Sequence, residues 1–213
     1  MLDVHAPHES VHGWRDFILH LVTITIGLFI ALSLEGCIEW QHHRHLVHEA
    51  EASLHDEIKA NSESLKNTIA DIHKQQEDLK HDVVVLKKFI KNPKSNDNDH
   101  MEINFGIRGF KDVGWRTAQS TGAFSYMPYA TAQEFADIYR TQDEINIAQH
   151  QAARDAIISL APFTNMSQND SPTSEQANVM KDHIEILQGQ LSLLDSWVKS
   201  LDEKYKTFLT AHP

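Results

Sequence analysis

Residues 17–34 have the sequence FILHLVTITIGLFIALSL, which contains eighteen residues and no formal charge. Asp16 and Glu35 bound this stretch. As an α-helix it would be about 27 Å long, close to the roughly 30 Å hydrocarbon core of a bilayer. The stretch therefore predicts one membrane-spanning helix, and a buried helix of a soluble protein is the alternative.

The flanks of this stretch agree with a span. Trp14 and Trp40 lie just outside its two ends, where an indole ring would sit among the lipid headgroups. A cleaved signal peptide is disfavoured, because no basic segment precedes the apolar run and no small-residue cleavage site follows it. We expect an irregular arm over 1–13, a transmembrane helix over 14–40 and a helical bundle domain over 41–213.

Composition limits the classes of partner. The chain has 213 residues, with 19 Lys and Arg against 30 Asp and Glu, and this net charge of −11 argues against a nucleic-acid partner. Its single cysteine, Cys37, cannot form an internal disulfide. Arg15 on one side of the span and Arg44 on the other balance each other, so charge counting leaves the membrane orientation open.

Beyond the span, the sequence predicts that the helix continues over 41–91. No proline occurs between Trp14 and Pro93, and Asn92-Pro93 is a helix stop. Apolar or small residues, with two polar exceptions, recur at helical steps of three and four; they are Val47, Ala50, Leu54, Ile58, Asn61, Leu65, Ile69, Ile72, Gln76, Leu79, Val83, Leu86 and Ile90.

A short helix is predicted over 113–122, with Gly122 as its C-terminal cap. Before it, Ile103, Phe105 and Ile107 alternate with polar residues and glycines, as in a strand. Because a lone short strand would have no pairing partner, we expect an ordered loop packed on the helices.

A longer helix is predicted over 129–161. Pro128 and a capping box of Thr131 and Glu134 mark its start, and Pro162 marks its end. Its inward face is rich in small residues and carries two aromatic rings, which favours close helix packing; these residues are Ala132, Ala136, Ala148, Ala152, Ala156, Phe135 and Tyr139.

The last helix, expected over 172–210, has the most regular pattern in the chain. Asp170 or Ser171 before Pro172 would start it. Its apolar residues alternate steps of three and four, the period of a helical-bundle seam; they are Ala177, Met180, Ile184, Leu187, Leu191, Leu194, Val198, Leu201, Tyr205 and Phe208. The predicted fold is all-α, with one N-terminal transmembrane helix that continues into a long stalk helix and an antiparallel helical bundle outside the membrane.

One face of the span carries small residues. Thr23, Gly27 and Ala31 lie four residues apart, and Glu35 continues the spacing. Such a stripe lets another membrane helix approach closely. It predicts packing against a partner helix, and a neutral lipid-facing surface is the alternative.

Histidines are the candidate ligands for a metal or a pigment. His20 lies one turn inside the span, where it could bond a partner helix, ligate a haem or pigment, or reach the interface. A denser cluster follows the span, and two or three of its members would share one face of a helix; it comprises His42, His43, His45, His48 and Glu49. The alternative is a solvated collar among the headgroups.

Two common catalytic templates are absent from the sequence, which has no phosphate-binding glycine loop and no nucleophile elbow. We therefore expect a non-catalytic chain without a cofactor. Aromatic residues and one arginine gather in the middle of the outer domain, either as the end cap and core of the bundle or as a ligand pocket; they are Trp115, Arg116, Phe124, Tyr126, Tyr129 and Tyr139.

The span also shows a resemblance. Residues 26–32, IGLFIAL, followed by Trp40 and a long polar helix, resemble an uncharacterised family of bacterial single-pass membrane proteins. Members have an IGxxIAL span and a helical outer domain with a segment like that from Trp115 to Gly122. The resemblance implies a short cytoplasmic N-terminus and a periplasmic helical domain on the inner membrane, although the family's usual basic N-terminal arm is missing here. It implies no activity.

Three functions are consistent with these observations. The first is a membrane-anchored accessory or scaffolding subunit that docks onto other membrane subunits or onto copies of itself. The second is a periplasmic sensor input module that acts through a separate signalling partner. The third is a metal-, haem- or pigment-binding membrane subunit.

Overall fold

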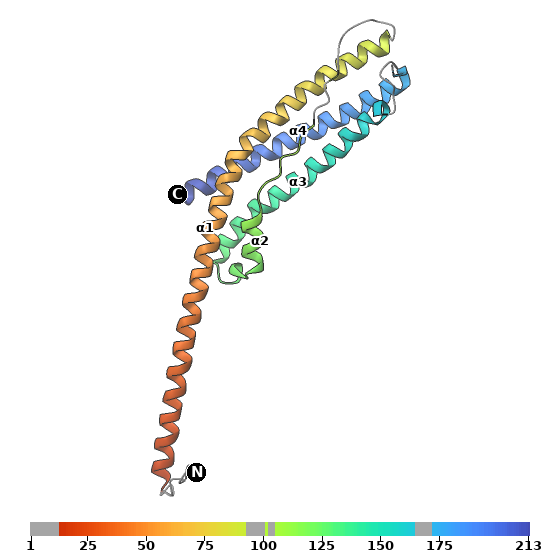
Figure 1. The fold of residues 1–213 in the computed structure, drawn as a ribbon. Coiled ribbons are helices and arrows are strands. Elements are labelled where there is room, and N and C mark those ends of the chain that lie inside the picture. The colour runs from red at the N-terminus through yellow and green to blue at the C-terminus, as the bar shows by residue number, and fades with distance from the viewer. Residues whose placement is uncertain (1–12, 93–100, 102–104, 165–171) are drawn as a thin grey trace, which may run out of the picture. The chain divides into compact units, whose positions relative to one another are not determined.

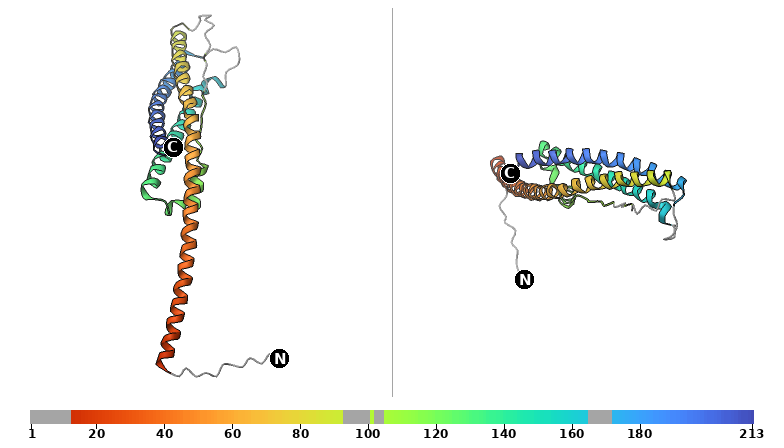
Figure 2. Two further views of the ribbon diagram at one scale, coloured as in Figure 1. Left: turned by 90° about the vertical axis from the view of Figure 1, so that its left-hand side faces the viewer. Right: turned by 90° about the horizontal axis from the view of Figure 1, so that it is seen from above.

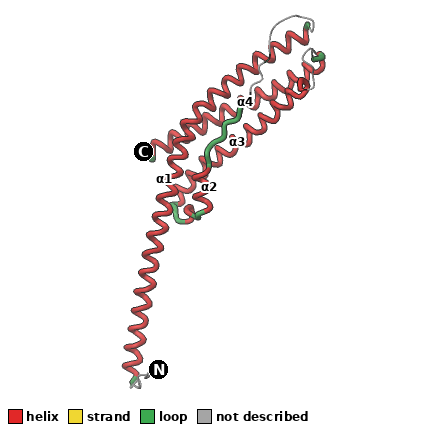
Figure 3. Tube along the Cα trace, in the orientation of Figure 1, coloured by secondary structure: helices red, strands yellow, loops and turns green. Residues whose placement is uncertain are grey.

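The computed structural model describes residues 13–92, 101, 105–164 and 172–213. Over these ranges the chain forms the helices α1 (Trp14–Lys91), α2 (Val113–Ser120), α3 (Tyr129–Thr164) and α4 (Ser174–Ala211), and the 3₁₀ turn η1 (Ala123–Ser125). The described residues contain no β-strand (Figure 3), so the predicted all-α class is confirmed. The chain divides into two compact units, Met1–Glu49 and Ala50–Pro213.

The first unit contains the N-terminal part of α1. This part of the helix is long and apolar enough to cross a membrane, with a mean hydropathy of 2.4 over its most apolar window. None of the side chains in that window is buried. The predicted spanning helix is thus present as a helix with an exposed apolar surface.

The second unit is a bundle of α1 from Ala50 onward, α3 and α4 (Figure 1). Three polar contacts show that α1 and α4 are antiparallel, because residues early in this part of α1 meet residues late in α4; these contacts are His55–His212, His73–Asp195 and Lys87–Glu185. Helices α3 and α4 lie side by side along their length (Figure 2) and are also antiparallel, with Asp155 bonded to Gln190 and Asp137 to Lys204.

The predicted seam of α4 forms the centre of the core. All ten residues of that seam, from Ala177 to Phe208, are buried. Burial of large apolar side chains of this kind is the main source of folding stability, at about 1.5–3 kcal/mol for each Leu or Ile. The sequence pattern therefore identified the inward face of α4 correctly.

Between Leu65 and Leu79 the buried face of α1 differs from the predicted stripe by one residue at two places, and the stripe's end residues Val47 and Ile90 are only half-buried. Thr68 and Gln75 are buried, whereas Ile69 and Gln76 are only half-buried. Thr68 and Ile69 lie three and four residues after Leu65, so either position fits a helical stripe. The prediction chose Ile69 because it is apolar. The structure instead buries polar residues at seven-residue spacing on this face, namely Asn61, Thr68, Gln75 and Asp82.

Two of these polar residues, Asn61 and Gln75, hold the connection between α1 and α2. Residues 105–112, hereafter the strap, run along the bundle without helix or strand structure (Figure 3). Asn61 bonds the backbone of Lys111 twice, as donor to its carbonyl and as acceptor from its N–H, both at 2.8 Å. Gln75 donates to the carbonyl of Gly106 at 3.2 Å. The expected ordered loop is therefore confirmed over 105–112, while Ile103 lies outside the described residues.

The predicted helix ends are partly right. Helix α1 ends at Lys91 as expected, and Gly122, with φ of +75°, follows the end of α2 in the left-handed conformation that glycine adopts readily. Thr131 lies inside α3, which begins at Tyr129, so the capping box predicted there is wrong. Helix α3 also continues past Pro162 to Thr164, because a proline in the last turn removes only one helical hydrogen bond.

The start of α4 lies later than predicted. Thr173 is its N-cap residue, whose side chain accepts a hydrogen bond from the Gln176 N–H at 3.2 Å, and the Gln176 side chain accepts from the Thr173 N–H at 2.8 Å. This reciprocal capping box satisfies two N–H groups at once and fixes the start of the helix. Asp170 and Ser171, the predicted start, lie outside the described residues.

Candidate functional site

The predicted packing stripe of the span is exposed. Thr23, Gly27, Ala31 and Glu35 all lie on the exposed surface of α1. A Cβ atom added to Gly27 would have no described atom within 4 Å, so nothing in the chain itself uses the close approach that glycine permits. The stripe remains a prediction of packing with a second helix.

The hydroxyl groups of the span are satisfied within the helix. Thr23 donates to the carbonyl of Leu19 at 2.8 Å, and Thr25 donates to that of Leu21 at 2.7 Å. Ser33 donates likewise to the carbonyl of Phe29 at 2.6 Å. A helix in hydrocarbon must satisfy its polar groups internally, and these hydroxyls meet that requirement.

The histidine cluster forms pairs in the described part of the chain. His45 Nε2 lies 3.1 Å from a carboxylate oxygen of Glu49, as the spacing predicted. His43 lies 3.9 Å from Glu39, and its ring centroid is 6.1 Å from that of His42. His48 and His20 are exposed. Among the described residues no three His, Cys, Asp or Glu side chains come together as metal ligands would.

The interfacial tryptophans are exposed at both ends of the predicted span. Trp14 lies in the first turn of α1. The guanidinium of Arg44 lies 5.4 Å from the centroid of the Trp40 ring, which is within the range of a cation–π interaction. An aromatic ring and a cation one turn apart suit the headgroup region, where both are favoured.

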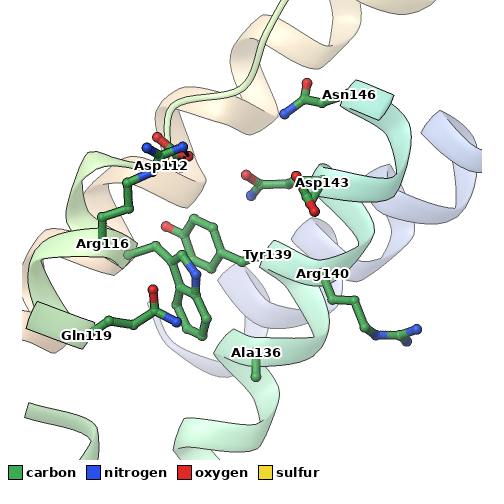
Figure 4. A pocket seen from close by; sticks show the side chains of 10 residues that line it. Asp112, Arg116, Gln119, Ala136, Tyr139, Arg140, Asp143 and Asn146 are labelled. Carbon is green, nitrogen blue, oxygen red and sulfur yellow. Dashed lines mark hydrogen bonds and ion pairs between the residues drawn. The ribbon is translucent and has the colours of Figure 1, made fainter. Parts of the chain in front are cut away.

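The bundle contains a pocket between α2 and α3 (Figure 4). Its volume is about 280 Å³. Its lining has two aromatic, four charged and three carboxamide side chains and one alanine, namely Asp112, Trp115, Arg116, Gln119, Ala136, Tyr139, Arg140, Gln142, Asp143 and Asn146. Of the aromatic residues singled out in the sequence, Trp115 and Tyr139 belong to the pocket, while Tyr126 and Tyr129 are exposed elsewhere.

The carboxylate of Glu57 on α1 fixes the α2 wall of this pocket. It accepts hydrogen bonds from the N–H of Gly114 at 2.8 Å and of Trp115 at 3.3 Å, at the start of α2. These N–H groups have no carbonyl partner within the helix, so an acidic side chain there satisfies them and interacts favourably with the helix dipole. A glycine at 114 suits this close approach, since a Cβ there would lie 3.0 Å from Ser53 Oγ, a tight contact.

Aromatic stacking joins α2 to α3. The rings of Trp115 and Tyr139 are stacked, with centroids 4.8 Å apart and an interplanar angle of 12°. Phe124 of η1 packs on Trp115 at 4.8 Å in a tilted arrangement. The Tyr139 hydroxyl donates to Glu57 at 2.6 Å, and burial, reinforced by that carboxylate, raises the pKa of Tyr139. The hydroxyl therefore stays protonated and acts as a donor.

The α3 wall carries polar groups that lack partners. Gln142 is only 2 % exposed, and neither of its amide atoms makes a hydrogen bond with the residues described here. Its amide lies beside the hydroxyl of Tyr205, whose pKa is raised by burial and lowered to a lesser extent by Gln142. The Oδ1 atom of Asn146 is buried and also unpaired within the described ranges. The sequence singled out the aromatic residues of this region but neither carboxamide.

Comparison with known protein families, curated proteins and solved structures finds no match to this chain. Its function must therefore be argued from its own surfaces and pocket.

A second apolar stripe runs along the outside of α4. The seam residues Ile184, Leu187, Leu191, Leu194, Val198 and Leu201 are fully engaged in the core. Val179, Ile186 and Leu193, by contrast, are 47 %, 56 % and 51 % exposed, and their seven-residue spacing places them on one face of α4. This outer stripe was not predicted from the sequence, because the seam accounts for the helical period by itself.

Proposed function

We propose that this chain is a non-catalytic, membrane-anchored interaction protein, an accessory or scaffolding subunit that docks onto other membrane subunits or onto copies of itself. Its apolar helix holds the bundle at a lipid bilayer, and the bundle presents a surface to a partner. The observation that carries the proposal is the outer stripe of α4, defined as Val179, Ile186 and Leu193.

Apolar residues at a strict seven-residue spacing are typical of a helix that packs against another helix. The outer stripe has this spacing although the core of the bundle is already filled by the seam. Gly189 lies between Ile186 and Leu193 on the same side, and no described atom lies within 4 Å of where its Cβ would be. A partner helix could thus approach α4 closely at the middle of the stripe.

In this proposal the anchor lies in the bacterial inner membrane and the bundle lies in the periplasm. The orientation rests on the resemblance of the span, since the positive charges flanking it are balanced. Protease added to intact spheroplasts should digest the bundle while cytoplasmic marker proteins survive. Protection of the bundle until the membrane is permeabilised would reverse the orientation.

Purification from membranes in a mild detergent, followed by mass spectrometry, tests the association. We expect co-purifying subunits or a homo-oligomer for the wild-type chain, and their loss in the triple variant Val179→Ser, Ile186→Ser, Leu193→Ser. A matched control replaces three exposed apolar residues off the stripe, Val84, Ile147 and Ile157, by Ser. A wild-type monomer without any co-purifying chain would contradict the proposal.

The pocket favours a second candidate, a sensor input module that acts through a separate signalling partner. A pocket with buried, unpaired polar groups is a feature of ligand-binding domains. A screen of small ligands by thermal unfolding tests this candidate, because a ligand that binds the folded chain raises its Tm. Absence of any stabilising ligand would remove its main support.

A further inference from the structure

We infer that the pocket between α2 and α3 binds a small organic cation, a primary amine with an apolar body. This inference concerns a different surface from the outer stripe of α4 and does not depend on the association proposed above. It would supply the ligand of the sensor candidate.

Three hydrogen-bond acceptors lie within little more than one turn of α3 at the pocket. Gln142 and Asn146 are four residues apart and Asp143 and Asn146 are three apart, so the geometry of the helix brings their side chains together. Figure 4 shows Asp143 and Asn146 on the side of α3 that borders the cavity. An ammonium group carries three N–H donors, which matches this set of acceptors in number.

The charges around the pocket also favour a cation. Arg116 is ion-paired with Asp112 at 2.6 Å. Arg140 contacts Asp137 at 2.9 Å and Glu144 at 3.1 Å, and its side chain is directed away from Asp143 (Figure 4). Asp143 makes no ion pair with any residue that the structure describes. The uncompensated charge of the pocket is therefore a carboxylate.

The buried carboxamide of Gln142 adds an energetic reason for a ligand. A buried polar group without a hydrogen bond costs about 1–3 kcal/mol. Gln142 and Asn146 line the pocket, and neither the Gln142 amide, which lies beside the Tyr205 hydroxyl, nor the Asn146 Oδ1 atom makes a hydrogen bond of ordinary geometry within the described chain. A ligand with several N–H donors would satisfy these acceptors, whereas a hydrocarbon would leave them unpaired.

The remaining lining selects for an apolar body of modest size. Trp115, Ala136 and Tyr139 provide the apolar part of the wall. A volume of about 280 Å³ lies just below the range for drug-sized ligand sites, roughly 300–1,000 Å³. An amine with one ring or a short alkyl chain fits these limits, and a peptide does not.

The test uses three probes of nearly equal size that differ in charge, namely benzylamine, benzyl alcohol and benzoate. Isothermal titration calorimetry with the full chain in detergent measures each Kd. We expect benzylamine to bind at least about tenfold more tightly than benzyl alcohol, as a charge-assisted hydrogen bond implies. Asp143→Asn should remove this preference, whereas Asp182→Asn, at an exposed carboxylate of α4, should leave it unchanged.

A gain-of-function variant complements the loss. Asn146→Asp places a second carboxylate beside Asp143 and should tighten benzylamine binding while weakening that of benzoate. Equal binding of all three probes, no heat from benzylamine at millimolar concentration, or an Asp143→Asn variant that keeps the preference would each overturn the inference. Circular dichroism of each variant verifies folding, and the subunits that co-purify with Asp143→Asn report separately on the association.

Discussion

The hydroxyl of Tyr139 on α3 donates a 2.6 Å hydrogen bond to the carboxylate of Glu57 on α1. The same carboxylate accepts the N–H groups of Gly114 and Trp115 at the start of α2. One acidic side chain thus connects the three helices around the pocket. This arrangement explains why a short helix such as α2, which would be unstable alone, keeps a defined place.

Tyr139→Phe removes this hydrogen bond while leaving the ring stacked on Trp115. Because Glu57 keeps its two backbone donors, we expect a loss of about 1–2 kcal/mol in the free energy of unfolding, measured by urea denaturation. Tyr129→Phe is the matched control, since Tyr129 is 82 % exposed and should change stability little. Equal effects of the two substitutions would show that the bond to Glu57 contributes nothing.

Asn61→Leu should release the strap from α1. The substitution removes both hydrogen bonds to the backbone of Lys111 and leaves its N–H and carbonyl groups unpaired, at a cost of about 1–3 kcal/mol for each group that stays buried. Native-state hydrogen exchange should show much faster exchange of the Lys111 amide. Unchanged protection of that amide would mean that another contact holds the strap.

Two glycines should respond to alanine with opposite signs. Gly189→Ala should stabilise the bundle by about 0.5–1 kcal/mol, because alanine favours the helix and nothing crowds its side chain. At Gly114 the added Cβ would lie 3.0 Å from Ser53 Oγ and 3.3 Å from a carboxylate oxygen of Glu57, so we expect destabilisation despite the same helical preference. Thermal unfolding of the two variants compares them directly, and equal shifts in Tm would refute the crowding at Gly114.

Asp195 on α4 should make stability depend on pH in the acid range. Burial acts to raise its pKa, but hydrogen bonds from Lys199 and His73 outweigh burial and hold the pKa below its usual value of 3.8. The carboxylate therefore contributes stability that is present above about pH 4 and is lost as pH falls through the lowered pKa. The stability difference between wild type and Asp195→Asn, measured by urea denaturation, should shrink from pH 7 toward pH 3, and a difference that stays constant over this range would contradict the prediction.

Membrane anchoring is the most direct prediction from the first unit. The full chain should remain with membrane vesicles in alkaline carbonate and should require detergent for release, as spanning helices do. Release of the chain by carbonate alone would leave α1 without a membrane role.

Elemental analysis and an absorption spectrum of the purified protein should show no stoichiometric metal or pigment at His20 or at the cluster from His42 to Glu49.

Local pattern was sufficient for much of the fold. The seam of α4 could be predicted because each of its ten residues is apolar and regularly spaced. The stop at Lys91 and the left-handed Gly122 followed from the chemistry of single residues. These features depend on residues within a few turns of one another.

Contacts between distant segments could not be predicted in the same way. Thr68 and Gln75 are buried on α1 because the strap covers that face, and nothing near them in the sequence indicates the strap. The pocket was indicated only by its aromatic residues, since its polar wall depends on α2, which Glu57 holds from more than fifty residues away. Which of two adjacent positions on a helix is buried therefore cannot be predicted until the segment that packs against the helix is known.

The strap is bound through its backbone by Asn61, Gln75 and Gln149, and through one side chain by the ion pair between Arg108 and Asp71. Residues at the exposed positions of the strap can therefore be substituted without destabilising the bundle. Ile107 is one such position and would accept a fluorophore or an epitope tag. A label there would report on the bundle in living cells while leaving both the pocket and the outer stripe of α4 unmodified.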